Sequence, residues 1–278
     1  MPNPILNDKQ FEEARSGWAA PTAPSPAGDV WPAPGQTTPV TDGPVTRWQG
    51  AMTVRGSITA TAALFVLLMI SATIGFLQTP DAEFVDGSWQ FSFPGLAMVG
   101  VIVGFAAVIG LYFKPTWAKF LGPIYAIAQG YFVGAISKAY ENLYDGIVLQ
   151  AAGATLAVFG VMLVLYNTRI IKVTDKFRRT VIFATLGIMA LYLVSFVMSL
   201  FGAEIPFINE PSLFGILFSV FVCGIAAMNL ALDFDFIERG SKAGLAKDYE
   251  WVAAVGLLVT IVWLYLEILR LLSKLRQN

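Results

Sequence analysis

The chain has 278 residues, of which 56% are hydrophobic and only 13% charged, and its formal net charge is −1. Soluble domains carry roughly 25% charged residues, so the composition excludes an ordinary soluble globule, and the lack of a basic excess excludes a nucleic-acid binder. The chain has no histidine and one cysteine, Cys223, which excludes histidine-dependent catalytic triads, zinc-binding HExxH motifs and an internal disulfide.

The first 48 residues are polar and rich in proline and small side chains. Such a segment cannot bury enough apolar surface to offset its ordering entropy. We therefore predict a disordered tail over residues 1–48, with a possible short helix from Asn7 to Arg15, where Asn7 and Gln10 have capping-box spacing. Residues 49–278 are predicted to form a single transmembrane domain.

Seven apolar segments follow the tail, and the first six contain no Asp, Glu, Lys or Arg. A helix needs about 20 apolar residues to cross about 30 Å of hydrocarbon, and backbone groups in lipid must be satisfied within the segment. We therefore predict an all-α, polytopic membrane protein with seven transmembrane helices. The segments are Ser57–Leu77, Phe91–Phe113, Phe120–Ser137, Gly146–Thr168, Val181–Ala203, Ser212–Leu232 and Trp251–Leu269.

Basic residues gather in alternate loops, which predicts the orientation of the chain, because cytoplasmic loops are enriched in Lys and Arg. The loops assigned to the cytoplasm carry Lys114, Lys119, Arg169, Lys172, Lys176, Arg178, Arg179, Arg239, Lys242 and Lys247. The opposite loops are mainly acidic. This rule predicts a cytoplasmic N-terminus. Because no organelle-targeting segment is evident in the sequence, the expected membrane is a bacterial inner (plasma) membrane. Seven crossings place the basic C-terminal end outside, against the rule, unless the last segment does not fully cross; full crossing is the favoured prediction.

Small residues recur four apart in the third segment, at Gly122, Ala126, Gly130 and Gly134. Small residues on one helix face let a neighbouring backbone approach closely, so this face predicts helix packing, with a groove along a pathway as the alternative. Gln129 and Lys138 are the polar residues on this helix that such a pathway would use.

Three acids, Asp233, Asp235 and Glu238, lie at the end of the sixth segment. Carboxylates in or near hydrocarbon are costly and indicate an ion or proton path, although a solvated helix end with Arg239 as counter-ion would also explain Asp235 and Glu238. Asp233 lies deepest, so we predict that it points into the bundle. A cluster of like charges at low dielectric could give a pH response without histidine.

Glu250 and Glu267 are the acids at the start and within the seventh segment. Glu267 can be an interfacial acid paired with Arg270 three residues later. It lies about 25 Å along the helix from Glu250, so antiparallel packing predicts that Glu267 and Asp233 lie near opposite membrane faces. The predicted partner of Asp233 is therefore left open among Asp235, Glu250 and a basic residue such as Arg179.

The sequence resembles the bacterial branch of the Bax inhibitor-1 family over about residues 48–275. The resemblance lies in five stretches: Pro123–Ser137, Tyr144–Gln150, Leu232–Glu238, Glu250–Trp251 and Trp263–Arg270. It implies six helices around a central seventh, and a calcium leak gated by pH through paired aspartates on the sixth and seventh helices. Asp233 occupies the sixth-helix position, whereas Glu267 stands where the family has its second aspartate.

The sequence therefore predicts one of two alternative functions. The first is a pH-sensitive cation leak, with calcium as the expected ion and membrane-embedded carboxylates as the gate. The second is a non-transporting regulator of membrane proteolysis or stress survival, whose partners would be a membrane protease or other membrane proteins. An enzyme is not expected, since the Gly-x-Gly-Asp motif of intramembrane aspartyl proteases is absent. No cofactor is expected apart from calcium as a transported ion; whether a metal is bound is left open.

Overall fold

A computed structural model describes residues 50–81, 83–85, 88–90, 94–202 and 210–277. In these ranges seven helices are long and apolar enough to cross a membrane, which confirms the predicted all-α, seven-helix fold. The predicted tail over residues 1–48, with its short helix, lies outside the described residues. The helices are α2 (Val54–Gln78), α3 (Gly95–Phe113), α4 (Ala118–Leu143), α5 (Ile147–Asn167), α6 (Asp175–Leu200), α8 (Leu213–Ala243) and α9 (Tyr249–Gln277).

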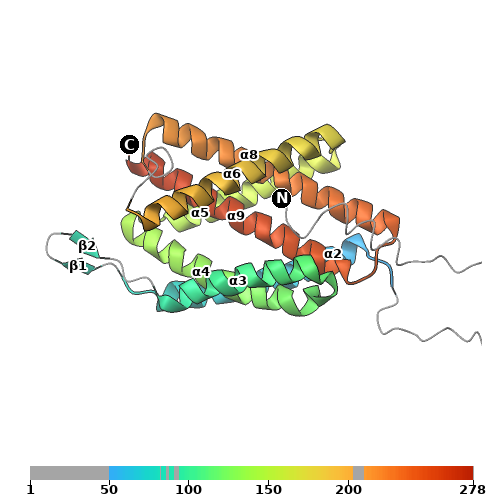
Figure 1. Cartoon of the computed structure of the whole chain (residues 1–278), viewed down its shortest axis with the longest axis horizontal. Coiled ribbons are helices and arrows are strands. Elements are labelled where there is room, and N and C mark those ends of the chain that lie inside the picture. The colour runs from blue at the N-terminus through green and yellow to red at the C-terminus, as the bar shows by residue number, and fades with distance from the viewer. Residues whose placement is uncertain (1–49, 82, 86–87, 91–93, 203–209, 278) are drawn as a thin grey trace, which may run out of the picture.

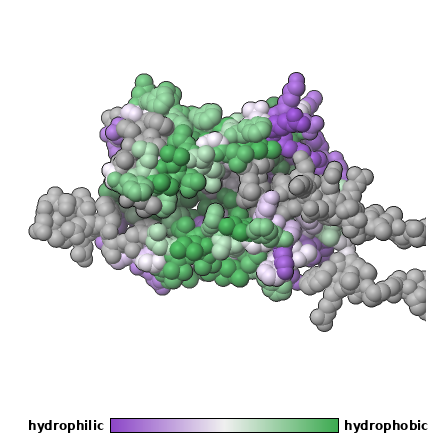
Figure 2. Space-filling model, in the orientation of Figure 1, coloured by the Kyte–Doolittle hydropathy of each residue, from purple (hydrophilic) through white to green (hydrophobic). Residues whose placement is uncertain are grey.

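Consecutive helices run in opposite directions along the long axis of the bundle, so their termini gather at its two ends (Figure 1). At the end called here the basic end, α2, α4, α6 and α9 begin and α3, α5 and α8 finish. A wide hydrophobic belt covers the visible face, with hydrophilic side chains gathered toward the ends (Figure 2). Large side chains such as Ile102 and Phe105 in α3 are more than 60% exposed. An apolar surface of this extent fits a lipid bilayer.

Helix α9 is the centre of the bundle. In its most apolar stretch 72% of the residues are buried, against 50% or less in each of the other six helices. It packs against α2, α4, α5 and α8, and it crosses the middle of the view in Figure 1. The family resemblance implied six helices around the seventh; the central position of α9 fits that expectation, and the main packing partners of α9 are these four helices.

Helices α2 and α4 form the closest pair, and the small-residue face of α4 makes their contact possible. A Cβ atom on Gly134 would overlap the backbone carbonyl of Ala72 in α2, and a Cβ on Gly130 would lie 2.5 Å from the carbonyl oxygen of Leu68. Ser71 of α2 also donates a hydrogen bond of 2.6 Å to the Ile127 carbonyl. The small residues spaced four apart in α4 therefore serve helix packing, which was the prediction preferred over a groove along a pathway.

Helix boundaries differ from the apolar segments mainly where charged residues begin. Helix α8 continues eleven residues beyond Leu232, to Ala243, and ends at Gly244 with the left-handed φ of 67°. A charged residue ends an apolar run but not a helix, because Glu, Arg and Lys all have good helix propensity. The three acids of α8 therefore lie within the helix, with at least one more turn after Glu238.

Among the described residues, a 3₁₀ turn and a two-stranded hairpin lie outside the seven apolar segments. A 3₁₀ turn, η1 (Pro115–Trp117), joins α3 to α4. Strands β1 (Glu83–Val85) and β2 (Ser88–Gln90) pair antiparallel, with Glu83 opposite Gln90, and form a hairpin that projects from the end opposite the basic end (Figure 1). The second apolar segment was predicted to begin at Phe91, whereas helix α3 begins at Gly95.

Candidate functional site

Asp235 of α8 is held between two arginines at the basic end of the bundle. Its Oδ2 lies 3.1 Å from Nη2 of Arg178 in α6 and 2.7 Å from Nε of Arg239, one turn further along α8. The residue is 9% exposed. The next residue, Arg179, which the sequence offered as a candidate partner of Asp233, is exposed. The ion pair with Arg178 joins α6 to α8, while Arg239 is the counter-ion that the sequence suggested.

Glu238 lies one turn further along α8 and joins that helix to α5. Its Oε1 is 2.5 Å from Nη2 of Arg169 and 2.6 Å from Nζ of Lys242, and its Oε2 accepts a hydrogen bond of 2.5 Å from the hydroxyl of Tyr166. The Arg169 and Lys242 side chains are 58% and 70% exposed. This cluster is therefore a hydrated surface network, where each ion pair contributes little free energy by itself.

Asp233 is the most deeply buried acid of α8, with only 2% of its surface exposed. Its neighbours Leu232 and Phe234 are also buried, and Phe234 packs edge-on against Phe159 of α5. The carboxyl group is thus within the bundle, as predicted from its position. An ionised carboxyl group in such a place raises the free energy of the folded protein unless other groups compensate for its lost hydration.

Glu250, the first acid of α9, caps the start of α2. Its Oε1 accepts hydrogen bonds of 2.9 Å from both the backbone N–H and the hydroxyl of Thr53. The Thr53 hydroxyl in turn accepts from the backbone N–H of Gly56. In a capping box an acid three residues after the N-cap bonds the N-cap N–H. Here Gly56 fills that position, and a glutamate from another helix supplies the carboxylate.

Gly56 leaves the space that Glu250 occupies. A Cβ atom at position 56 would overlap the Glu250 carboxylate, so only glycine fits without moving the acid. The same end is tied by a backbone hydrogen bond of 2.6 Å from Met52 N–H to the Leu245 carbonyl. Glu250 thus fastens the first helix to the last, and the positive end of the α2 helix dipole favours its negative charge.

Glu267 is 2% exposed and lies where α6, α8 and α9 meet. Its carboxylate accepts hydrogen bonds from Tyr192 of α6 at 3.0 Å and from the indole N–H of Trp263 at 3.3 Å. Arg270 lies 3.6 Å away in the predicted i,i+3 pair, and its guanidinium packs over the Tyr192 ring. The pairing with Arg270 agrees with the sequence interpretation, but the site is buried.

Lys274 completes the polar face of α9 and was not singled out from the sequence. It is 2% exposed, and its Nζ donates hydrogen bonds to the Gly215 carbonyl at 3.1 Å and to the Ser219 hydroxyl at 2.9 Å in α8. Its spacing of four residues from Arg270 and seven from Glu267 places the three on one helix face. That spacing was the available signal, but a lysine near the chain end is usually exposed.

Buried polar groups therefore follow the junction of α6 and α8 with α9. Between the two ends, Asn229 of α8 donates a hydrogen bond of 2.9 Å to the Thr185 hydroxyl of α6. Glu267 lies near Cys223, and Cys223 is about 15 Å along α8 from Asp233 at 1.5 Å per residue. Asp233 and Glu267 are thus far apart in depth, as the antiparallel geometry predicted.

Gln129 is not part of this polar row. Its side chain is half-buried in α4 and lies against the position where Gly104 of α3 would carry a Cβ atom. The structure therefore places Gln129 in the α3–α4 contact, while the α8 and α9 acids lie around α9. Of the predicted gating and ion-binding residues, Asp233, Asp235 and Glu238 share the basic end with Glu250. Glu267 lies farther along α9, toward the opposite end.

The chain matches a family model described as Bax inhibitor 1 like, over residues 3–277. The match covers nearly the whole chain, including the stretches around Asp233, Glu250 and Glu267. No curated protein matches the chain.

Proposed function

Because the chain belongs to the Bax inhibitor 1 like family, we propose that it is a pH-sensitive cation leak, with calcium as the expected ion and its buried carboxylates as the gate. The observation that supports this proposal is the burial of Asp233 and Asp235, at 2% and 9% exposure, in a membrane-spanning helix. Carboxylate oxygens suit a hard cation such as Ca²⁺, and charged groups inside a membrane protein are retained chiefly for function.

The gate in this proposal is the contact between α6 and α8. The ionised Asp235 attracts Arg178 and so holds the start of α6 against α8. In this proposal a proton taken up by the buried Asp233, two residues before Asp235 in α8, removes negative charge close to this junction and weakens the contact. The helices can then separate and admit water to the polar row through Asn229 and Glu267. The leak should therefore increase as the pH falls from 8 to 6.

Calcium flux into liposomes tests the proposal directly. Purified full-length protein, its Asp233→Ala variant and an Asp145→Asn control should be compared between pH 6 and pH 8. Asp145 is an exposed acid in the loop between α4 and α5, so its substitution should leave the pH profile unchanged. Asp233→Ala should flatten the profile. Identical flux and pH dependence in all three proteins would remove Asp233 from the mechanism, and no flux in any of them would contradict the leak.

One observation favours the alternative, a regulator of proteolysis or stress survival that does not transport ions. Lys274 is buried at the far end of the polar row with its charge directed at the Gly215 carbonyl, and a cation leaving by this route would meet it together with Arg270. In the regulator the acids would hold the helices together, and the exposed basic loops would contact a partner. A purified protein that fails to conduct and is recovered in complex with a membrane protease would support this function.

A further inference from the structure

A groove lies between α2 and α5, with α9 as its floor. One cavity of about 540 Å³ is lined at its sides by residues such as Ile58 of α2 and Leu163 of α5, and at its base by Leu257 and Ile261 of α9. A second cavity of about 440 Å³ shares Phe65, Thr155, Leu156 and Ile261 with the first. The two cavities adjoin, and each has a volume in the range of small-molecule sites.

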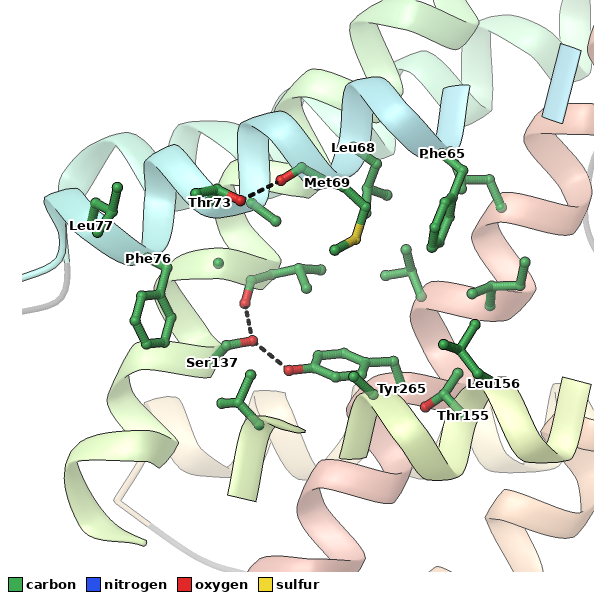
Figure 3. A pocket seen from close by; sticks show the side chains of 18 residues that line it. Phe65, Leu68, Met69, Thr73, Phe76, Leu77, Ser137, Thr155, Leu156 and Tyr265 are labelled. Carbon is green, nitrogen blue, oxygen red and sulfur yellow. Dashed lines mark hydrogen bonds between the residues drawn. The ribbon is translucent and has the colours of Figure 1, made fainter. Parts of the chain in front are cut away.

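The groove walls present carbon rather than hydrogen-bonding groups. In the second cavity (Figure 3), the Tyr265 and Ser137 hydroxyls lie 2.6 Å apart and bond one another, and Ser137 also bonds the Val133 carbonyl. The Thr73 hydroxyl donates to the Met69 carbonyl within α2. With their polar atoms engaged in this way, the walls suit a hydrocarbon chain better than an ion or a sugar.

The mouth of the groove at the basic end of the bundle carries charged side chains. Tyr166, Asn167 and Glu238 line the first cavity there, and Glu238 holds the exposed side chains of Arg169 and Lys242. Two cations around one carboxylate leave a net charge of +1 at this mouth. A positive cluster beside an apolar groove at the membrane surface matches an anionic lipid, because basic residues at an interface attract anionic head groups.

We propose that this groove binds an acyl chain of an anionic phospholipid, whose phosphate group lies at Arg169 and Lys242. The chain passes between α2 and α5 and reaches the central helix at Leu257, which is only 5% exposed. A lipid in this position differs from one that covers the outside of the bundle, because it contacts three helices that are distant in sequence.

The lipid site and the proposed leak meet on α8, where Phe234 and Glu238 line the first cavity beside the gate residues Asp233 and Asp235, but they use different faces of α9. The groove uses Leu257, Ile261 and Tyr265 of α9, whereas the polar row uses Glu267 and Lys274. At 100° per residue these two sets lie on different faces of the helix. Lipid binding can therefore be measured without ion flux, and failure of one proposal leaves the other standing.

Native mass spectrometry of the full-length protein in mild detergent is the test, with dioleoyl phosphatidylglycerol and dioleoyl phosphatidylcholine as probes. The two lipids share acyl chains and differ in head-group charge. Ala62→Phe fills the first cavity, because Ala62 lines it. Ala63→Phe is the matched control, since Ala63 is also exposed on α2 but lines neither cavity. Lys242→Gln removes one basic residue from the mouth, and Lys176→Gln removes an exposed lysine elsewhere at the basic end.

The wild-type protein should retain phosphatidylglycerol in preference to phosphatidylcholine by about fivefold or more. Ala62→Phe should lower retention of both lipids about tenfold through steric exclusion, while Ala63→Phe matches wild type. Lys242→Gln should lower the preference about fivefold, and Lys176→Gln should not. Equal retention by the two phenylalanine variants would overturn the groove as the site. Equal retention of the two lipids by wild type would overturn the anionic head group.

Discussion

Glu250 shows how a local helix signal can be completed by a residue far away in the sequence. Thr53 begins α2 as its N-cap, and the acid that bonds its backbone N–H lies 197 residues later. An acid placed locally at position 56 would have completed an ordinary capping box. With Gly56 and Glu250, the start of α2 instead depends on the position of α9. The capping of the first transmembrane helix is therefore complete only when the last one is in place.

Gly56→Ala should destabilise the protein for this reason. The new Cβ would displace the flexible Glu250 carboxylate and break its two hydrogen bonds to Thr53. A hydrogen bond to a charged group contributes about 1.5–3 kcal/mol to the free energy of unfolding. Thermal unfolding in detergent should therefore begin several degrees lower. Glu250→Gln should act in the same direction and less strongly, because the amide oxygen can still accept.

Gly153→Ala is the matched control for that measurement. Gly153 is an exposed helical glycine of α5 with open space around it, so alanine there should stabilise the helix by about 0.5–1 kcal/mol through its better propensity. If Gly56→Ala behaved like Gly153→Ala, the Glu250 cap would contribute nothing measurable to stability.

The elements of the bundle were largely readable from the sequence because each crossing is a long apolar run. Their ends were not. Hydropathy marks where the membrane-spanning composition stops, whereas a helix ends at its cap. Helix α4 therefore extends six residues past Ser137, to Leu143, and α8 eleven past Leu232. The contacts of the acids depend on those extra turns and on side-chain partners such as Arg178, which no spacing rule distinguishes from its neighbour Arg179.

Among the described residues, the ion pair of Arg178 with Asp235 joins α6 to the bundle at the basic end. The α6 residues in its most apolar stretch are only 17% buried, and its principal packing partner is α8. Beyond the Arg178–Asp235 ion pair, the hydrogen bond between Thr185 and Asn229 is the next link along the helix. The opening of α6 should therefore be sensitive to this ion pair.

Arg178→Gln should loosen the first turns of α6. Loss of a partly buried charged hydrogen bond costs about 1.5–3 kcal/mol, so backbone amide exchange over residues 175–185 should become at least about tenfold faster. Hydrogen exchange with mass spectrometry on the full-length protein in detergent measures this. Lys176→Gln, an exposed substitution in the same turn, should leave exchange unchanged. Equal exchange in both variants would show that the Arg178–Asp235 ion pair does not hold the first turns of α6.

For the whole molecule, the basic C-terminal end no longer conflicts with seven crossings. Lys274 of α9 is buried and donates hydrogen bonds to Gly215 and Ser219 of α8. Arg270 pairs with Glu267. Arg276 donates hydrogen bonds to the Asp145 carbonyl and to Gln150 at the end opposite the basic loops. These contacts bind the three positive charges to the protein itself. They also place the end of α9 beside the α4–α5 loop, so α9 spans the full length of the bundle.

The direction in which the bundle sits in the membrane is then a testable prediction. The many basic residues of the α5–α6 and α8–α9 loops should hold those loops in the cytoplasm, with Asp145 and Gln277 on the outer side. In a Cys223→Ala background, single cysteines at Asp145, Gln277 and Lys172 report each side, since all three residues are exposed. In spheroplasts of an expressing bacterium, a membrane-impermeant maleimide should label Asp145→Cys and Gln277→Cys. It should label Lys172→Cys only after the membrane is permeabilised. Labelling of Lys172→Cys alone would mean that the protein is inserted in the opposite direction, and the outward-facing mouth of the polar row would then be the one with Asp235 rather than Lys274.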